Sequence, residues 1–307
     1  MELSTLKSEI NAIVGEENVL VDELMSNHTS FRIGGPADLF VIPRTAPEVR
    51  KVLVACDKAD VPVHILGRGS NLLVADSGLR GVVVQIAGNL SEINIGEKGF
   101  IVADAGVTNS KLAAVACRNS LSGYEFAAGI PGTIGGAAIM NAGAYDGEFK
   151  QVASGLVCLT PDRELIGVSA EEARWGYRTS MMQDAGYTVL SVTLQLHEGD
   201  QDEIQARMDE LAKRRSDKQP LDIPSAGSTF KRPPGQFAGK LIQDAGMQGF
   251  RIGGAEVSTK HAGFVVNIDN ATASDVRAVI DAVKQRVLQE FGVELEPEVR
   301  MWGFEDC

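Results

Sequence analysis

Two glycine-rich stretches mark the middle of the sequence: Gly-Arg-Gly-Ser-Asn at 67–71 and Gly-Ile-Pro-Gly-Thr-Ile-Gly-Gly-Ala-Ala-Ile-Met-Asn-Ala-Gly at 129–143. The first directly follows an apolar segment, 63–66, which we predict to be a strand. Its glycines allow backbone N–H groups to converge on an anion, and Ser70 and Asn71 add donors. Because Leu72 stands in the sixth position, the motif is neither GxGxxG nor a Walker A loop. An ordinary tight turn is the alternative interpretation.

The second stretch belongs to a region of unusual composition. Fourteen of the 33 glycines lie between residues 67 and 143. Small residues at this density let the backbone approach a flat ligand closely, although a purely structural loop would have the same composition. Residues 126–145 carry no charge, yet their five glycines and one proline argue against a membrane helix. Two such segments together favour a dinucleotide cofactor.

Composition narrows the class of protein further. Across 307 residues, 29 Lys and Arg face 41 Asp and Glu, a net charge of −12 that disfavours a nucleic-acid partner. The N-terminus lacks a cationic start followed by an apolar run, so we expect no signal peptide and a cytoplasmic location. The cysteines at 56, 117, 158 and 307 form no CxxC and no zinc-binding pattern. We therefore expect free thiols and no metal site.

Helical and strand patterns alternate along the whole chain. The periodicity predicts helices over 47–59, 203–215 and 274–291, and a closing strand over 293–301. Ser4 is predicted to cap a helix whose apolar face carries Leu6, Ile10, Ile13 and Val14. This mixture indicates an α+β protein in three parts. The predicted parts are residues 1–66, joined by 294–307; residues 67–200; and residues 201–293.

Five segments together resemble the UDP-N-acetylenolpyruvoylglucosamine reductase family. They are the two glycine-rich stretches, Trp-Gly-Tyr-Arg-Thr-Ser at 175–180, Ala-Gly-Ser-Thr-Phe-Lys at 226–231 and Leu-Glu-Pro-Glu-Val-Arg at 295–300. Their order and spread, from about residue 31 to residue 300, make the resemblance specific. It implies a vanillyl-alcohol-oxidase-type FAD-binding domain, an adjoining N-terminal α/β part, and a C-terminal α/β substrate domain.

The resemblance also implies the ligands and the chemistry. The family uses NADPH and non-covalent FAD to reduce an enolpyruvyl UDP-sugar to UDP-N-acetylmuramate for peptidoglycan. Neither His28 nor His64 stands in a context that suggests covalent flavin attachment. The resemblance implies these cofactor-binding residues: Gly67, Arg68, Gly69, Ser70, Asn71, Leu72, Gly129, Ile130, Pro131, Gly132, Thr133, Gly135, Gly136, Asn141, Ala142 and Gly143.

Three residues match the catalytic positions of the family. Arg178 matches the electrophile at the substrate carboxylate, since a guanidinium is always charged and can bind a carboxylate in bidentate fashion. Ser228 matches the proton donor, and Glu298 the acid that stabilises the intermediate. From the residues alone, a surface ion pair, a turn serine and a solvated acidic strand end are the simpler interpretations.

Positive charge gathers near Ser228 in an otherwise acidic protein. Lys218, Lys231 and Arg232 are expected to bind the substrate diphosphate, and His261 to contact the substrate, although solvated surface positions are the alternative. One branch of the family inserts a loop whose tyrosine covers the substrate. Only residues 179–227, 49 in all, separate Arg178 from Ser228, so the chain resembles the branch without that loop.

Two other functions are compatible with a flavin-type fold. The first is a flavin oxidase acting on an alcohol or hydroxy acid, and the second is an inert flavin- or nucleotide-binding scaffold. The segments around Arg178, Ser228 and Glu298 argue against both, because all three positions hold reactive side chains.

Overall fold

The computed structural model describes residues 3–304, which fall into two compact units. Within the described residues, the first unit comprises 3–20, 39–68 and 81–215, and the second comprises 21–38, 69–80 and 216–304. The three ranges predicted from the sequence remain a prediction, since these units group segments by contact and not by chain order.

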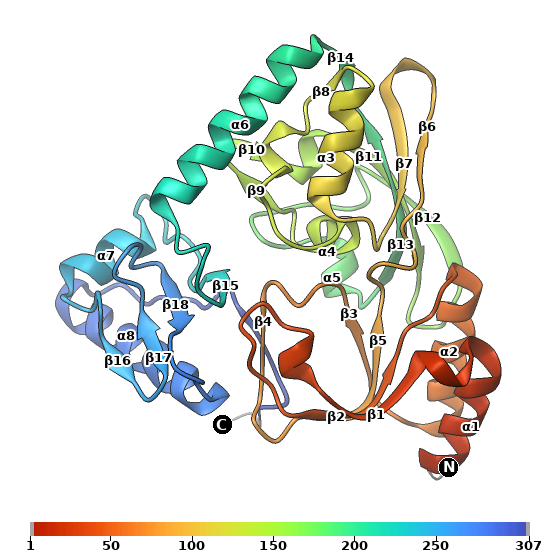
Figure 1. Ribbon diagram of the computed structural model, residues 1–307, viewed down its shortest axis with the longest axis horizontal. Coiled ribbons are helices and arrows are strands. Elements are labelled where there is room, and N and C mark those ends of the chain that lie inside the picture. Colours follow the sequence, from red (N-terminus) through yellow and green to blue (C-terminus); the bar gives the residue numbers. More distant parts are fainter. Residues whose placement is uncertain (1–2, 305–307) are drawn as a thin grey trace. The chain divides into compact units, whose positions relative to one another are not determined.

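Eight α-helices and nineteen strands are found within residues 3–304 (Figure 1). The helices are α1 Leu3–Val14, α2 Ala46–Ala59, α3 Asn109–Arg118, α4 Ile134–Ile139, α5 Met181–Asp184, α6 Gln201–Lys218, α7 Ala238–Asp244 and α8 Ala273–Phe291. The strands up to residue 122 are β1 Val19–Leu24, β2 Pro36–Val41, β3 Val63–Leu66, β4 Leu72–Val74, β5 Leu79–Gln85, β6 Ile93–Ile95, β7 Phe100–Asp104 and β8 Leu121–Ser122. The later strands are β9 Gly143–Ala144, β10 Gly147–Glu148, β11 Ala153–Leu159, β12 Leu165–Ser169, β13 Thr188–Gln195, β14 His197–Glu198, β15 Ser225–Ser228, β16 Arg251–Ile252, β17 Ala255–Val257, β18 Phe264–Asn267 and β19 Arg300–Trp302.

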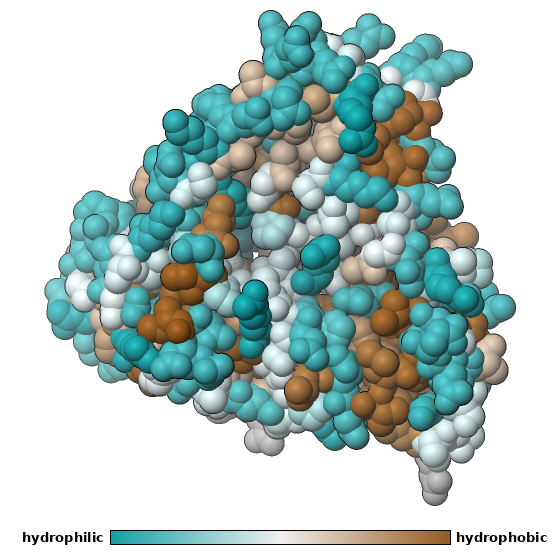
Figure 2. Space-filling view, viewed as in Figure 1, coloured by the Kyte–Doolittle hydropathy of each residue, from teal (hydrophilic) through white to brown (hydrophobic). Residues whose placement is uncertain are grey.

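A five-stranded antiparallel sheet, in the order β12-β11-β13-β7-β6, forms the middle of the first unit. Helix α4 packs on β13 and β7. Side chains of β7 alternate as its period of two requires: Ile101 and Ala103 are buried, whereas Phe100 and Val102 are each 41% exposed. Figure 2 shows apolar residues gathering at the surface over this part of the sheet. The buried face therefore supports the glycine-rich segment that contains α4.

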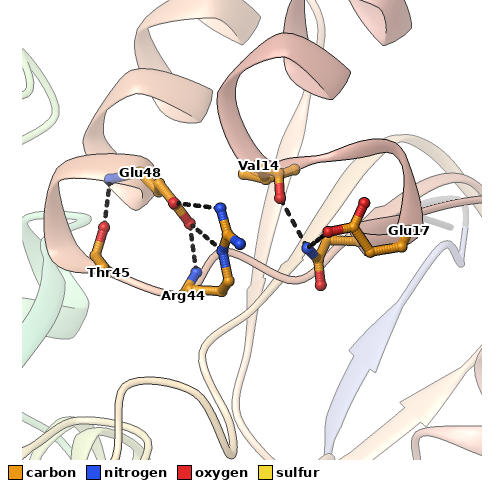
Figure 3. Close-up of polar contacts among 6 residues, drawn as sticks. Val14, Glu17, Arg44, Thr45 and Glu48 are labelled. Atoms are coloured by element: carbon orange, nitrogen blue, oxygen red, sulfur yellow. Dashed lines mark hydrogen bonds and ion pairs between the residues drawn. The ribbon is translucent and has the colours of Figure 1, made fainter.

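Helices α1 and α2 pack against each other, with Leu6, Ile10 and Val14 of α1 fully buried. Thr45 caps α2, because its hydroxyl accepts a hydrogen bond from the Glu48 N–H (Figure 3). The Glu48 carboxylate in turn accepts bonds from the N–H and the guanidinium of Arg44, at 2.7 and 3.0 Å. Burial opposes ionisation of this carboxyl, but the bonds from Arg44 prevail and lower its pKa.

The second unit contains the antiparallel sheet β15-β18-β17-β16, on which α8 packs. Thr272 and Asp275 form a capping box at the start of α8, and Gly292 ends it in the left-handed conformation that a glycine adopts at low cost. The Asp76 carboxylate accepts the N–H groups of Ala273 and Ser274 at 2.7 and 3.0 Å. Strand β4 pairs in parallel with β19, which joins the end of the first glycine-rich stretch to the end of the chain.

Most predicted elements are confirmed, but two predictions are wrong. Helix α1 begins at Leu3, so Ser4 lies inside the first turn and not at the cap. The predicted strand 293–301 shrinks to β19, because Pro297 has no N–H to donate and bridges Phe230 as an isolated pair. Cys56, Cys117 and Cys158 are buried free thiols, while Cys307 lies outside the described residues. Within residues 3–304, no helix is long and apolar enough to span a membrane.

Candidate active site

In the first unit, the two glycine-rich stretches meet at Gly67 and Thr133. A Cβ built on Gly67 would lie 2.8 Å from the Thr133 hydroxyl oxygen, so any side chain at 67 would displace that threonine. Thr133 is only 3% exposed, and its hydroxyl caps α4 by accepting the Gly136 N–H at 3.3 Å. The start of the first motif and the middle of the second therefore form one continuous surface of the unit.

Several motif glycines are explained by contacts within the protein. A Cβ at Gly69 would lie 2.1 Å from the carbonyl oxygen of His28, and a Cβ at Gly135 would lie 2.8 Å from the Cβ of Ala105 and 3.2 Å from its carbonyl oxygen. By contrast, a Cβ at Gly136 would meet only the Thr133 hydroxyl, at an ordinary 3.6 Å. Close contacts within the protein therefore account for glycine at positions 67, 69 and 135, as the structural alternative expected, whereas they do not account for Gly136.

A buried polar network fixes the loop between Gly129 and Thr133. The Tyr124 hydroxyl, on a side chain 1% exposed, donates to Asn109 Oδ1 at 2.8 Å. Asn109 Nδ2 donates to the carbonyl oxygen of Ile130 at 3.2 Å, and the Asn109 N–H donates to that of Gly132 at 3.3 Å. Two carbonyls of the loop are thus turned toward Asn109.

This orientation decides where the loop's N–H groups point. The C=O and N–H of a trans peptide point in opposite directions, so the Thr133 N–H points away from Asn109. Within residues 3–304, neither the Gly132 N–H nor the Thr133 N–H donates to an acceptor. Unpaired N–H groups on a loop of this kind fit the negatively charged oxygens of a diphosphate or the carbonyl edge of a flavin. The residues present therefore fit FAD.

Arg178 stands in a tight turn of the same unit. Its φ of +58° is unusual for a side chain with a Cβ, and its guanidinium donates to the carbonyl oxygen of Gly143 at 3.2 Å. Trp175 and Ser180 flank the turn and donate to the carbonyl oxygens of Ala138 and Ile139, at 2.7 and 2.8 Å. The turn is thus attached to the second glycine-rich stretch, which holds Arg178 beside the predicted cofactor residues.

Asn141 takes part in this attachment. Its Nδ2 donates to Glu148 at 2.7 Å and to the carbonyl oxygen of Gly176 at 2.9 Å, while its Oδ1 accepts the Lys150 N–H at 2.9 Å. Both ends of the Asn141 carboxamide are therefore hydrogen-bonded to other groups of the protein. Its cofactor-binding role stays a prediction, and the contacts give it a role in positioning the turn that carries Arg178.

In the second unit, backbone hydrogen bonds bring Ser228 and Glu298 together. Ser228 ends β15, and the next residue, Thr229, accepts the Glu298 N–H on its carbonyl oxygen at 2.8 Å. Thr229 itself is fixed by the sheet, since its N–H donates to the Gly263 carbonyl oxygen at 2.8 Å. Ser228 is exposed and Glu298 half-buried. Two predicted catalytic residues 70 positions apart therefore stand next to each other on a rigid backbone.

The end of the first glycine-rich stretch is hydrogen-bonded to the main chain around Glu298. Asn71 Nδ2 donates to the carbonyl oxygen of Glu298 at 3.2 Å, and the carbonyl oxygen of Asn71 accepts the Arg300 N–H at 3.0 Å. A predicted cofactor residue is thus bonded to the main chain of a predicted catalytic residue. Gly227 has a φ of +76° with open space beside it, so the backbone conformation is what requires a glycine there.

The predicted substrate-binding cations differ in their surroundings. Lys231 forms an ion pair with Glu296, and Arg232 lies 4.7 Å from the ring centroid of Phe237. Lys218 is exposed at the end of α6. His261 is half-buried; its Nδ1 accepts the Gly263 N–H at 3.1 Å, and burial lowers its pKa. Their substrate contacts stay predictions.

No sequence motif predicts the Tyr124–Asn109 pair. A tyrosine and an asparagine 15 residues apart match no motif, and their partners are backbone carbonyls that only the folded chain brings near. Within residues 3–304, no group of three His, Cys, Asp or Glu side chains is arranged to hold a metal ion.

Comparison with known proteins assigns the family. The chain is 49% identical over 303 residues to UDP-N-acetylenolpyruvoylglucosamine reductase from Alkaliphilus metalliredigens, covering 99% of both proteins. It is 47% identical to the Clostridium beijerinckii protein of that name, covering 97% of both. The chain belongs to the UDP-N-acetylenolpyruvoylglucosamine reductase family. Residues 37–169 match the family model for an FAD binding domain, and residues 219–302 match that for the C-terminal domain of this reductase.

Solved structures agree with this assignment. The reductase from Thermus caldophilus has a TM-score of 0.78 at 35% identity, covering 91% of this chain and 97% of that one. The 4-ethylphenol oxidase from Gulosibacter chungangensis, at 16% identity, has a TM-score of 0.50 and covers 96% of this chain and 64% of its own. The second likeness concerns the fold alone, and it agrees with the expected vanillyl-alcohol-oxidase type.

Proposed function

We propose that this chain reduces the enolpyruvyl group of a UDP-N-acetylglucosamine derivative to give UDP-N-acetylmuramate, with NADPH as the source of the hydride. The observation that carries the proposal is the pairing of Ser228 with Glu298 through Thr229. It brings the main chain of Ser228 close to that of Glu298, which supports a site with a proton donor and an acid at the carbon next to the carboxylate. Membership of the reductase family supports the same substrate, and a cytoplasmic location with it.

The FAD-binding residues belong to the two glycine-rich stretches. The N–H groups of Gly132 and Thr133 would donate to the cofactor, while Asn109 and Tyr124 hold these groups in place. When bound, FAD accepts a hydride from NADPH and passes it to the substrate double bond. The loops orient the cofactor and exclude water from it.

Arg178 binds the carboxylate of the enolpyruvyl group. Hydride addition at the β-carbon of the double bond leaves negative charge on the α-carbon and on this carboxylate, so a fixed cation stabilises the transition state more than the ground state. One guanidinium donor bonds to the carbonyl oxygen of Gly143, which holds the cation beside the second glycine-rich stretch.

Ser228 donates the proton that completes the reduction. An alcohol is a weak acid, and Glu298 in its protonated form would donate a hydrogen bond to the negative charge that develops on the substrate. Because the Ser228 main chain is fixed by its pairing with Phe264 and by the bonds of Thr229, its hydroxyl reaches one face of the substrate. A fixed face is needed because the new carbon centre is chiral.

The substrate diphosphate is the proposed ligand of Lys218, Lys231 and Arg232. These cations follow or precede the Ser228 strand, and a diphosphate near them would be stabilised by charge. Lys231 would have to exchange Glu296 for a phosphate oxygen, which lowers its expected contribution below that of the exposed Lys218.

A direct assay tests the function. Purified full-length protein should bind FAD and oxidise NADPH only when the enolpyruvyl nucleotide is present, giving UDP-N-acetylmuramate in equal amount. Turnover of an alcohol with O₂, with no effect of the enolpyruvyl nucleotide, would support the flavin oxidase instead. A flavin-binding protein that consumes neither substrate would support an inert scaffold.

A further inference from the structure

Ser30 lies outside the segments that carry the family resemblance, yet it joins two parts of the candidate site within the second unit. Its N–H donates to the carbonyl oxygen of Gly69 at 3.1 Å, and its hydroxyl donates to the carbonyl oxygen of Ser225 at 2.6 Å. Gly69 belongs to the first glycine-rich stretch, and Ser225 begins β15, the strand that ends at Ser228. Two donors of one residue thus connect that stretch to the strand of the predicted proton donor.

Strand β15 depends on outside contacts because its own pairing is irregular. It is the outer strand of the sheet β15-β18-β17-β16 (Figure 1). Ser225 pairs with Val266 and Ser228 with Phe264, so three residue steps of β15 face two steps of β18 and the strand bulges. Gly227, inside this bulge, has a φ of +76°. A bulge changes the direction of neighbouring side chains, and here the neighbour is Ser228.

The two ends of the bulge are held by different groups. At the end near Ser228, the Thr229 hydroxyl accepts the N–H of Val265 in β18 at 2.9 Å. At the other end, the carbonyl group of Ser225 is held by Ser30, which lies outside the sheet. A shift of Ser30 would therefore move one end of the bulge relative to the other, and with it the direction in which the Ser228 side chain leaves the main chain.

The turn that carries Ser30 is itself fixed. The hydroxyl of the preceding residue, Thr29, donates to the Ile33 carbonyl oxygen at 2.9 Å and accepts the Ile33 N–H at 3.2 Å. The following residue, Phe31, is 1% exposed, and its carbonyl oxygen accepts a hydrogen bond from Asn267 Nδ2 of β18 at 3.1 Å. Ser30 is exposed, so loss of its hydroxyl should change alignment more than stability.

We propose that Ser30 is a positioning residue for the reduction: it aligns the bulge of β15, and with it Ser228, with the first glycine-rich stretch. The inference rests on the proposed function, in which that stretch binds FAD and Ser228 donates the proton. Hydride and proton go to adjacent carbons of the substrate, so the proton donor has to be aligned with the cofactor. A single residue bonded to both segments provides this alignment.

The test compares Ser30→Ala, Ser30→Thr and Thr29→Val in the full-length protein with FAD bound. Threonine keeps a hydroxyl at position 30. Thr29→Val is the matched control, because it removes a hydroxyl from the same turn that bonds to Ile33 and not to Ser225. Stopped-flow absorbance gives the rates of flavin reduction by NADPH and of flavin oxidation by the enolpyruvyl substrate. Hydrogen exchange of the amides at 225–230 reports on β15 and needs no substrate.

Ser30→Ala should slow flavin oxidation roughly 10- to 100-fold, as expected for a small misalignment, and leave flavin reduction within about twofold of wild type. Amide exchange at 225–230 should become faster. Ser30→Thr should recover most of both losses, and Thr29→Val should cause neither. A Ser30→Ala oxidation rate within about threefold of wild type would overturn the proposal. An equal loss in Thr29→Val, or unchanged exchange at 225–230 in Ser30→Ala, would overturn it as well.

A double variant tests whether Ser30 acts through Ser228. Ser30→Ala should have little further effect on oxidation in the Ser228→Ala background, because the group that it positions is already absent. Effects that multiply would contradict the positioning role. Normal oxidation in Ser228→Ala alone would instead contradict the proton-donor role in the proposed function, and exchange at 225–230 would still decide whether Ser30 fixes β15.

Discussion

The two units present their functional residues in different ways. In the first unit, the glycine-rich loop is positioned by buried side chains, chiefly Tyr124 and Asn109, which bond to backbone carbonyls. In the second, Ser228 and Glu298 are positioned by the backbone itself, through the carbonyl oxygen of Thr229. The first arrangement leaves the N–H groups of Gly132 and Thr133 available to a ligand. The second positions the side chains of Ser228 and Glu298.

This difference matches the chemistry that each unit is proposed to perform. Binding a large cofactor needs many fixed N–H donors, which side-chain substitutions in the loop would leave unchanged. Proton transfer needs one hydroxyl in one place, which a single substitution removes. We therefore expect changes at Ser228 to alter the rate with little effect on FAD content, and changes at Asn109 or Tyr124 to alter FAD binding.

Ser228→Ala should give the largest effect. Loss of the proton donor should lower kcat by roughly 100- to 10,000-fold while FAD content stays at the wild-type level, because general acid catalysis is typically worth this much. Ser228→Cys should retain more activity than Ser228→Ala, since a thiol can still deliver a proton. Steady-state assays of both variants, with the flavin absorbance as the measure of occupancy, decide this. A Ser228→Ala rate within about threefold of wild type would assign protonation to another group.

Arg178→Ala tests the catalytic side chain that the first unit carries. It should lower kcat/KM for the enolpyruvyl substrate by about 100- to 1,000-fold, because a donor to developing charge is lost. NADPH oxidation by an artificial electron acceptor provides the control and should be little changed. Equal loss in both assays would mean that Arg178 serves the turn, through its bond to Gly143, and not the substrate.

Asn109→Ala should act on FAD affinity. The Tyr124 hydroxyl and the Ile130 carbonyl would lose their partner in the interior, which typically costs about 1–3 kcal/mol and corresponds to roughly a 5- to 150-fold weaker dissociation constant if the loop relaxes. Asn119→Ala is the matched control, since Asn119 caps the other end of α3 and is exposed. Unchanged FAD binding in Asn109→Ala would mean that the loop does not depend on this network.

A smaller effect is expected from His261 in the second unit. Burial holds its folded-state pKa below the ordinary value of 6.5, and its Nδ1 must stay unprotonated to accept the Gly263 N–H. The unfolded state then binds more protons, so this histidine favours folding at neutral pH and that contribution is lost as pH falls through 6.5. His261→Gln should flatten the decline of the melting temperature between about pH 7 and 5. An unchanged decline would exclude this histidine as its source.

Local sequence was enough to predict many elements and the order of the motifs. Helix 274–291 was confirmed almost to the residue, because its apolar period, the cap at Thr272 and the stop at Gly292 agree with one another. The prediction of a strand over 293–301 was wrong because its local signals conflict. Leu295 and Val299 are apolar and buried as in a strand, but Pro297 interrupts the hydrogen bonding between strands.

The site was predictable only where it consists of motif residues. Arg178, Ser228 and Glu298 were named from resemblance, and the structure adds that the last two are neighbours. Asn109 could not be found in this way. Its significance depends on the carbonyl group of Ile130, which lies 21 positions away in the sequence, and only folding brings these groups together.

The central claim is that Ser228 acts in the oxidation of reduced flavin by the enolpyruvyl substrate and not in flavin reduction, and one stopped-flow experiment tests it. Flavin absorbance is followed in Ser228→Ala, first during reduction by NADPH and then, after prereduction, during oxidation by the enolpyruvyl substrate. We predict a reduction rate within about twofold of wild type and an oxidation rate at least 100-fold slower. Equal slowing of both half-reactions, or normal oxidation, would contradict the account.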